Sequence, residues 1–182
     1  MTAQLAVLGL LVEQPLHGYA IERLIDERGM RNWTAIGFSS IYQVLDQLVT
    51  SGWAEVQVEA APGRGKERRV HHVTTGGLRH WEAKALSALA DVETDPGDFL
   101  MALSGLPFPD RAAVVDALRR RAEHLESRLA DLNRDLMEVR PVPRHVEAMF
   151  AYTSSRVACE KDWVRSYLAD LANPPEEQEH PE

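Results

Sequence analysis

Residues 53–59, WAEVQVE, constrain the fold most strongly, because apolar spacing changes there from a helical period to strict alternation. Alternation of this kind indicates a half-buried β-strand. Residues 60–65 contain one proline and two glycines, which is typical of a turn, and residues 67–74 predict a returning strand. We therefore expect a β-hairpin at this point in the chain.

Three segments with helical apolar spacing precede this hairpin. The first covers residues 3–13, the second opens at His17-Gly18 and stops at Gly29, and the third ends at Gly52. Ser40 and Gln43 have the spacing of a capping box, which predicts the start of the third helix. Three short helices followed by a hairpin form a winged helix, whose third helix enters the DNA major groove while the wing reaches an adjacent groove or the backbone.

The remainder of the chain is predicted to be helical. A helix starts at Thr75, Asp95-Pro96-Gly97 breaks it, and a short helix covers residues 99–103. Residues 110–140 and 144–172 then form two long helices, separated by prolines, with apolar residues spaced by three and four. The two seams can close on each other within one chain or pack against a second chain. We favour a homodimer, because one recognition helix reads only a half-site, and we expect it to be held together by Leu118, Leu125, Leu129, Leu132, Val157 and Val164.

The predicted fold is mainly α with a small β-hairpin. An N-terminal winged helix-turn-helix is followed by a helical, antiparallel coiled-coil-like dimerisation domain. We place the DNA-binding domain at residues 1–80, the dimerisation and effector-sensing domain at 81–173, and a polar, Pro-rich disordered tail at 174–182.

Charge is distributed unevenly along the chain. The net charge of -8 rules out a protein that is basic throughout, but residues 61–80 carry five basic side chains and only one acidic one. Polar side chains on the outer face of the third helix can bond base edges or phosphates, and the basic run supplies phosphate contacts. From these patterns the expected DNA-binding residues are Ser39, Ser40, Gln43, Gln47, Arg64, Lys66, Arg68 and Arg69.

Three stretches resemble the PadR family of transcriptional regulators. They are LAVLGLLVEQPLHGYAIERLI, SSIYQVLDQLVTSGWAEV and GRGKERRVHHVTTGG. The first matches the family pattern at Leu8, Leu10, Leu11, Pro15, Gly18, Tyr19 and Ile21, and the second matches it at Ser39, Tyr42, Leu45, Leu48 and Gly52. The third ends in His71, Val73, Thr74 and Gly77. The resemblance covers about residues 4–80, and the long helices that follow are similar to those of the longer PadR subfamily.

Two departures from the family pattern bear on DNA contact. The family often has basic residues in the middle of the recognition helix, where this chain has Asp46 and Gln47, and it usually has tyrosine where this chain has His71. The resemblance implies that the phenols of Tyr19 and Tyr42 bond phosphates, with packing between helices as the alternative.

The resemblance also implies a function. We expect a dimeric repressor in the cytoplasm, without a membrane segment, that binds double-stranded DNA at a palindromic operator and releases it when an aromatic or hydrophobic effector binds. The alternative is a winged-helix protein-interaction module that binds no specific operator. The candidate effector-binding residues are aromatic: Trp81, Phe99, Phe150 and Trp163.

No residue pattern predicts catalysis or a cofactor. Gly63 to Lys66 lack the spacing of a phosphate-binding loop, and His71 and His72 face opposite sides of a strand, so they do not converge on one metal ion. The chain has a single cysteine, Cys159, which excludes a Cys-rich zinc module. We therefore expect no enzyme activity, no metal and no cofactor.

Overall fold

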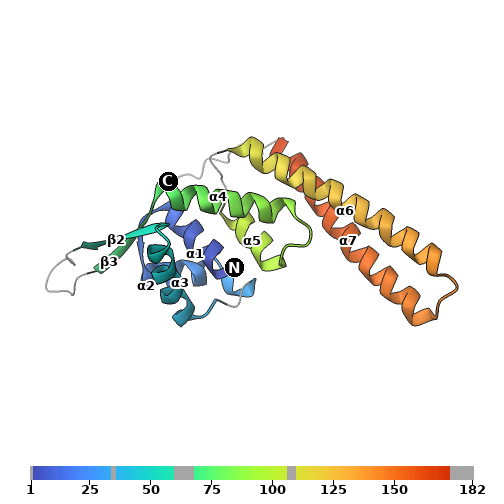
Figure 1. Ribbon diagram of the computed structural model, residues 1–182, viewed down its shortest axis with the longest axis horizontal. Coiled ribbons are helices and arrows are strands. Elements are labelled where there is room, and N and C mark those ends of the chain that lie inside the picture. Colours follow the sequence, from blue (N-terminus) through green and yellow to red (C-terminus); the bar gives the residue numbers. More distant parts are fainter. Residues whose placement is uncertain (1, 34–35, 60–67, 106–109, 173–182) are drawn as a thin grey trace, which may run out of the picture. The chain divides into compact units, whose positions relative to one another are not determined.

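A computed structural model describes residues 2–33, 36–59, 68–105 and 110–172, apart from the side chains of residues 38 and 39. The chain divides into two compact units. The first contains residues 1–89 and 93–109, and the second contains residues 90–92 and 110–182. The prediction of a mainly helical chain with a small β-element is confirmed (Figure 1).

Three helices form the helix-turn-helix part of the first unit. They are α1 (Thr2–Glu13), α2 (Gly18–Glu27) and α3 (Phe38–Thr50), with a short 3-10 turn, η1 (Met30–Asn32), between the last two. Helix α1 is buried from Leu5 to Leu11, so it forms the centre of this unit. Helix α2 begins after His17, whose Nδ1 accepts a hydrogen bond of 3.0 Å from the Ala20 backbone N–H, and Gly29 beyond its end adopts a φ of 62°.

The sheet has one strand more than the sequence predicts. Strands β2 (Ala54–Glu59) and β3 (Arg68–Val73) form the expected antiparallel hairpin, and β1 (Leu16–His17) pairs with the other edge of β3. The predicted hairpin is therefore confirmed, and β1 is an additional strand that the sequence did not predict. A strand of two residues is too short to show a period of two, and its pairing comes from the tertiary fold.

Helix α4 (Thr75–Ala90) begins immediately after β3 and is tied to the start of β2. The Thr74 hydroxyl donates to the Gly52 carbonyl at 2.7 Å and accepts from the Gly77 N–H at 3.0 Å, and the Thr74 N–H donates to the Trp53 carbonyl at 3.0 Å. This cluster of hydrogen bonds joins the wing to α4.

Helix α5 (Pro96–Ser104) begins earlier than expected. We predicted a break at Asp95-Pro96-Gly97, but Asp95 is the N-cap of α5 and Pro96 its first residue. The Asp95 carboxylate accepts a hydrogen bond of 2.8 Å from the Gly97 N–H. Helix α4 already ends at Ala90, and these three residues start the next helix, as expected of an N-cap followed by proline.

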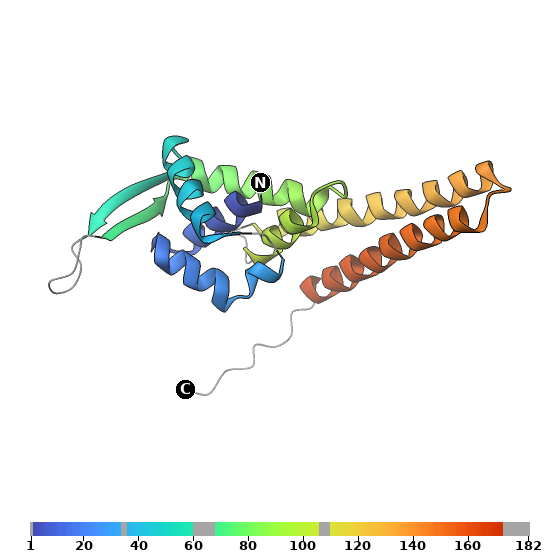
Figure 2. The same cartoon turned by 90° about the horizontal axis from the view of Figure 1, so that it is seen from below.

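The second unit is an antiparallel hairpin of two long helices, α6 (Arg111–Val139) and α7 (Arg144–Ala172) (Figures 1 and 2). Both are close to the predicted ranges. Arg121 of α6 is 3% exposed, and its guanidinium donates to the Glu160 carboxylate of α7 at 2.8 Å and to the Asp91 carbonyl at 2.6 Å. This buried cation ties α6 to α7 and to the short segment that begins the unit.

Candidate nucleic-acid interface

Helix α3 presents one apolar and one polar face. Ile41, Val44, Leu45 and Leu48 are buried, whereas Gln43 and Gln47 are exposed. The two glutamines lie four residues apart, so they project from the same side of the helix. This arrangement is the one expected of a helix that packs on one side and reads bases on the other.

The predicted capping box at the start of α3 is wrong. The helix begins at Phe38, and its N-cap is Gly37, which has extended backbone angles and makes no side-chain cap. Ser40 therefore lies inside the first turn and is half-buried. The side chain of Ser39 lies outside the described residues.

The two tyrosines of the sequence motifs border the same region. Tyr19 is 66% exposed, and its ring lies 6.5 Å from that of His17 at 21°. Tyr42 is 42% exposed but also packs against Gly18, where an added Cβ would approach its Cε1 to 2.7 Å. Tyr42 thus combines a packing role with an accessible edge, and Tyr19 is largely accessible.

Strand β3 carries the described part of the basic run. Arg68 and Arg69 are both exposed, opposite Glu59 and Val58 of β2 respectively. Arg64 and Lys66, which we also predicted to contact DNA, lie outside the described residues.

An open pocket of about 400 Å³ lies between the N-terminus of α2, helix α3 and strand β3. Its walls bring together four of the predicted DNA-binding residues and add groups that sequence analysis gave no such role. The lining residues are His17, Gly18, Tyr19, Tyr42, Leu45, Asp46, Arg68, Arg69 and His71.

His71 is the unusual member of this group. It is only 5% exposed, and its Nδ1 is buried without a hydrogen-bond partner among the described residues. Because side chains alternate along a strand, His71 shares its face of β3 with Arg69. The sequence predicts that side chains alternate between the two faces of β3, but it does not predict which of these faces is buried.

Burial is the main cause that lowers the pKa of the His71 imidazole below its ordinary value. The positive charges of Arg69 and His72 lower that pKa further, whereas a hydrogen bond with the Leu16 backbone and the negative charge of Asp46 act to raise it. Burial thus favours the neutral form of His71, whereas the nearby Asp46 carboxylate favours its charged form.

The aromatic side chains predicted to bind an effector are divided between the two units. Trp81 and Phe99 are buried in the first unit, and Phe150 and Trp163 belong to the second. Trp81 packs tightly between two glycines: an added Cβ would lie 3.0 Å from its Nε1 at Gly9 and 2.3 Å from its Cζ2 at Gly105. Trp163 is 45% exposed and stacks on Tyr167 with 5.2 Å between ring centroids.

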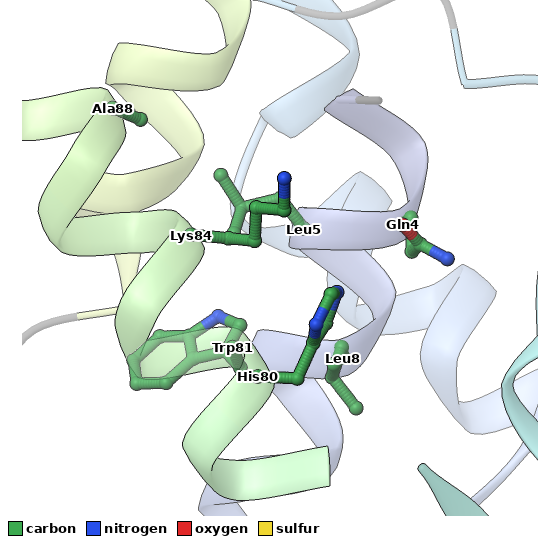
Figure 3. A pocket seen from close by; sticks show the side chains of 7 residues that line it. All are labelled: Gln4, Leu5, Leu8, His80, Trp81, Lys84 and Ala88. Atoms are coloured by element: carbon green, nitrogen blue, oxygen red, sulfur yellow. The ribbon is translucent and has the colours of Figure 1, made fainter. Parts of the chain in front are cut away.

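Trp81 also lines a very small, mainly apolar cavity of about 10 Å³ between α1 and α4 (Figure 3). Leu5 and Leu8 of α1 form one side, and His80 and Lys84 of α4 accompany Trp81 on the other. Burial, followed by the charge of Lys84, lowers the pKa of His80, whose ring stacks on Trp53 at 3.6 Å.

Most of the seam residues are already buried within one chain. Leu118, Leu125, Leu132 and Val164 are buried, whereas Leu129 and Val157 are only half-buried. Large apolar side chains are nevertheless exposed on the hairpin: Met137, Val139, Met149, Tyr152 and Trp163.

Within the described ranges, no cluster of three or more His, Cys, Asp or Glu side chains is placed to hold a metal ion. None of the helices in those ranges combines the length and apolarity needed to cross a bilayer.

Residues 7–83 match the model of the transcriptional regulator PadR-like family. Among solved structures, the chain is similar to Bacillus subtilis PadR in complex with operator DNA, with 19% identity over 94% of this chain and 99% of that one and a TM-score of 0.46. It is also similar to the PadR-like transcriptional regulator BC1756 from Bacillus cereus, with 22% identity over 94% and 96% of the two chains and a TM-score of 0.42. No curated protein matches the sequence.

Proposed function

We propose that this chain, whose residues 7–83 match the model of the PadR-like family of transcriptional regulators, is a dimeric repressor whose operator is released when a small aromatic molecule binds. The observation that carries the proposal is the pocket at which exposed residues of α3, Tyr42 and Asp46, meet the exposed Arg68 and Arg69 of β3. The matching family is one of transcriptional regulators, which supports the prediction that the chain has no catalytic activity.

Helix α3 and strand β3 have different roles in the proposed recognition of DNA. Gln43 and Gln47 are exposed on the side of α3 away from its packing face, where a carboxamide can form two hydrogen bonds with an adenine edge. Arg68 and Arg69 are exposed on the wing and supply phosphate contacts that carry no sequence information. Arg64 and Lys66 extend the same basic run in the sequence.

Selection of bound sequences from random duplex DNA tests the specific part of this proposal. We expect an enriched palindrome, because a helix-turn-helix dimer reads two half-sites about 34 Å apart. A low-salt signal that vanishes uniformly with salt, without an enriched sequence, would instead favour the protein-interaction alternative.

Salt dependence tests the role of the wing arginines at the DNA backbone. Replacing Arg68 and Arg69 by alanine should make the log-log dependence of affinity on salt shallower by about 0.9 for each phosphate that the protein no longer neutralises. Arg119→Ala is the matched control, because Arg119 is an exposed arginine of α6 that pairs with Asp116 at 3.4 Å. Equal salt slopes for the wing variant and the control would contradict the role of the wing.

The dimer is supported by apolar surface that one chain leaves exposed on α6 and α7. Met149 and Tyr152 are 66% and 65% exposed, and Leu129 is half-buried. Large apolar side chains grouped on a surface are typical of an interface. A second copy of this chain is the partner that a palindromic operator requires.

Sedimentation of two variants tests this assembly. Leu129→Glu should dissociate the dimer and greatly weaken operator binding, and Tyr152→Glu should do the same without altering the half-buried seam. Arg128→Glu, a charge change at an exposed position next to the seam, is the control. Monomeric variants that bind the operator as tightly as the wild type would refute the dimer mechanism.

The effector class is supported by the accessible aromatic stack of Trp163 and Tyr167 on α7. A planar molecule can add to such a stack, and it releases DNA only if it binds the DNA-free form more tightly. We expect a panel of phenolic acids to quench tryptophan fluorescence in the wild type and much less in Trp163→Phe. Release of operator DNA by a quenching ligand completes the test.

A further inference from the structure

We infer that the pocket between the N-terminus of α2, helix α3 and strand β3 binds a phosphate group of the DNA backbone, and that His71 takes up a proton when it does so. This inference rests on the proposed function, because it assigns one phosphate contact of the same DNA-binding surface to a defined pocket. The phosphate oxyanion is the ligand chemistry, and the DNA backbone is its source.

The first argument is the charge around the pocket. Arg68 and Arg69 supply two positive charges, and the N-terminus of α2 adds the positive end of a helix dipole. Tyr19 and Tyr42 border the pocket with phenol groups that can donate to phosphate oxygens. These groups suit an anion with several acceptor oxygens.

The second argument is the unpartnered nitrogen of His71. A buried polar atom without a hydrogen bond is costly, and in native proteins such an atom usually has a ligand, a water molecule or a functional reason. Among the described residues, Nδ1 of His71 is such an atom, in a side chain that is 5% exposed and lines the pocket. The hydrogen bond of His71 with the Leu16 backbone uses the other ring nitrogen, which therefore carries the proton of the neutral ring. Nδ1 is then an acceptor, and a phosphate oxygen can satisfy it only if the ring takes up a second proton.

Asp46 explains why the proton matters. Its carboxylate also lines the pocket and offsets one of the two arginine charges, which weakens the attraction for a phosphate. A proton on His71 compensates for that negative charge. The other titratable groups near His71 are His17 at the start of α2 and His72 on the opposite face of β3.

The direction in which DNA affinity changes with pH follows from the coupling between DNA binding and proton binding at His71. Burial lowers the pKa of His71 in the free protein, and a bound phosphate raises it, so DNA binding takes up a proton. Affinity should therefore increase as the pH falls through the bound-state pKa and level off below the free-state pKa. Between the free-state and bound-state pKa values, DNA affinity changes by at most about tenfold for each pH unit.

Two measurements test the inference with the full chain. In the first, NMR follows the His71 imidazole during pH titrations with inorganic phosphate, with the selected operator duplex, and with chloride at matched ionic strength. We expect both phosphate ligands to raise the pKa of His71 and chloride to leave it unchanged. This measurement needs no variant, so a folding defect cannot confuse it.

In the second, calorimetry in buffers of different ionisation enthalpy counts the protons taken up when the duplex binds. We expect His71→Gln to abolish most of the proton uptake. His72→Gln, a change at the adjacent residue on the other face of β3, should retain it.

The outcomes separate this inference from the proposed function. Duplex binding without proton uptake, or with the same uptake in His71→Gln, would overturn the inference and leave the regulator intact. An effect of inorganic phosphate alone, with a duplex that binds but leaves the pKa of His71 unchanged, would overturn the assignment to the DNA backbone. A chain that binds no duplex would refute the proposed function, and the inorganic phosphate titration would still decide whether the pocket takes a phosphate.

Discussion

Gly77 is the residue whose replacement should most clearly disrupt the winged domain. It lies in the first turn of α4, where the helix passes against the start of β2. A Cβ at this position would lie 2.0 Å from the Trp53 carbonyl oxygen and 2.8 Å from its carbonyl carbon. Because carbon and oxygen normally approach no closer than about 3.3 Å, the backbone of the wing or of α4 must move by more than about 1 Å.

The cost can be worked out from the contacts at this junction. Forcing extra atoms into a packed site costs about 1–3 kcal/mol. A backbone shift also weakens the hydrogen bonds of Thr74 to Gly52, Trp53 and Gly77, at about 1 kcal/mol for each bond that breaks. Alanine returns at most about 1 kcal/mol in helix propensity. The net loss for Gly77→Ala is therefore about 2–4 kcal/mol, which lowers the melting temperature of a domain of this size by roughly 10–20 °C.

Gly76→Ala provides a matched control in the same helical turn. A Cβ at Gly76 would meet the Thr74 Oγ1 at 3.6 Å and the Gly52 carbonyl at 4.0 Å, which are ordinary contacts. This variant should be neutral or slightly stabilising. Thermal unfolding followed by circular dichroism at equal protein concentration compares the two. If Gly77→Ala melts within about 2 °C of Gly76→Ala, the close approach of α4 to Trp53 does not exist in solution and the reasoning fails.

Three further predictions concern single residues of the two units. Gln43→Ala should change the preferred operator sequence more than the total affinity, and equal losses on specific and random DNA would make Gln43 a backbone contact. Asp46→Asn should raise DNA affinity at neutral pH several-fold, by roughly 1 kcal/mol. It should also shift the proton-linked increase in affinity to lower pH, because the Asp46 carboxylate raises the pKa of His71. DNA binding that is unchanged at all pH values would contradict this. Arg121→Met should lower the free energy of unfolding by roughly 2–4 kcal/mol, because the Glu160 carboxylate and the Asp91 carbonyl lose the guanidinium that donates to them. Urea denaturation of this variant measures the loss, with Glu160→Gln as a comparison.

The elements that could be predicted from the sequence are those with a long periodic pattern. Helices α6 and α7 were found within a residue or two, because each contains several turns of regular apolar spacing. Strand β2 was found because its alternation covers most of a short segment. The polar face of α3 was also predicted correctly, since Gln43 and Gln47 lie opposite its apolar positions.

The features that were missed depend on contacts between distant residues. Strand β1 has two residues and is fixed only by its pairing of Leu16 with His71. The buried pair of Arg121 and Glu160 joins residues 39 positions apart, and nothing local distinguishes that arginine from the other arginines of α6. Asp95 was misinterpreted for another reason, because an N-cap and a helix break use the same residue types.

The distribution of charge determines which part of the chain can approach DNA. Residues 81–182 contain twenty acidic and twelve basic side chains, whereas residues 1–80 are neutral and contain the basic run. DNA phosphates are therefore repelled by residues 81–182 and attracted only near the wing. This restricts the encounters that lead to DNA binding to one surface. The carboxylate of Asp46 within that surface weakens the attraction further, so in the proposed mechanism the affinity depends on a modest number of arginines and on the protonation of His71. A chain organised in this way binds DNA weakly unless sequence contacts on α3 add to the phosphate contacts, and specificity follows from the low non-specific affinity as much as from the strength of the specific contacts.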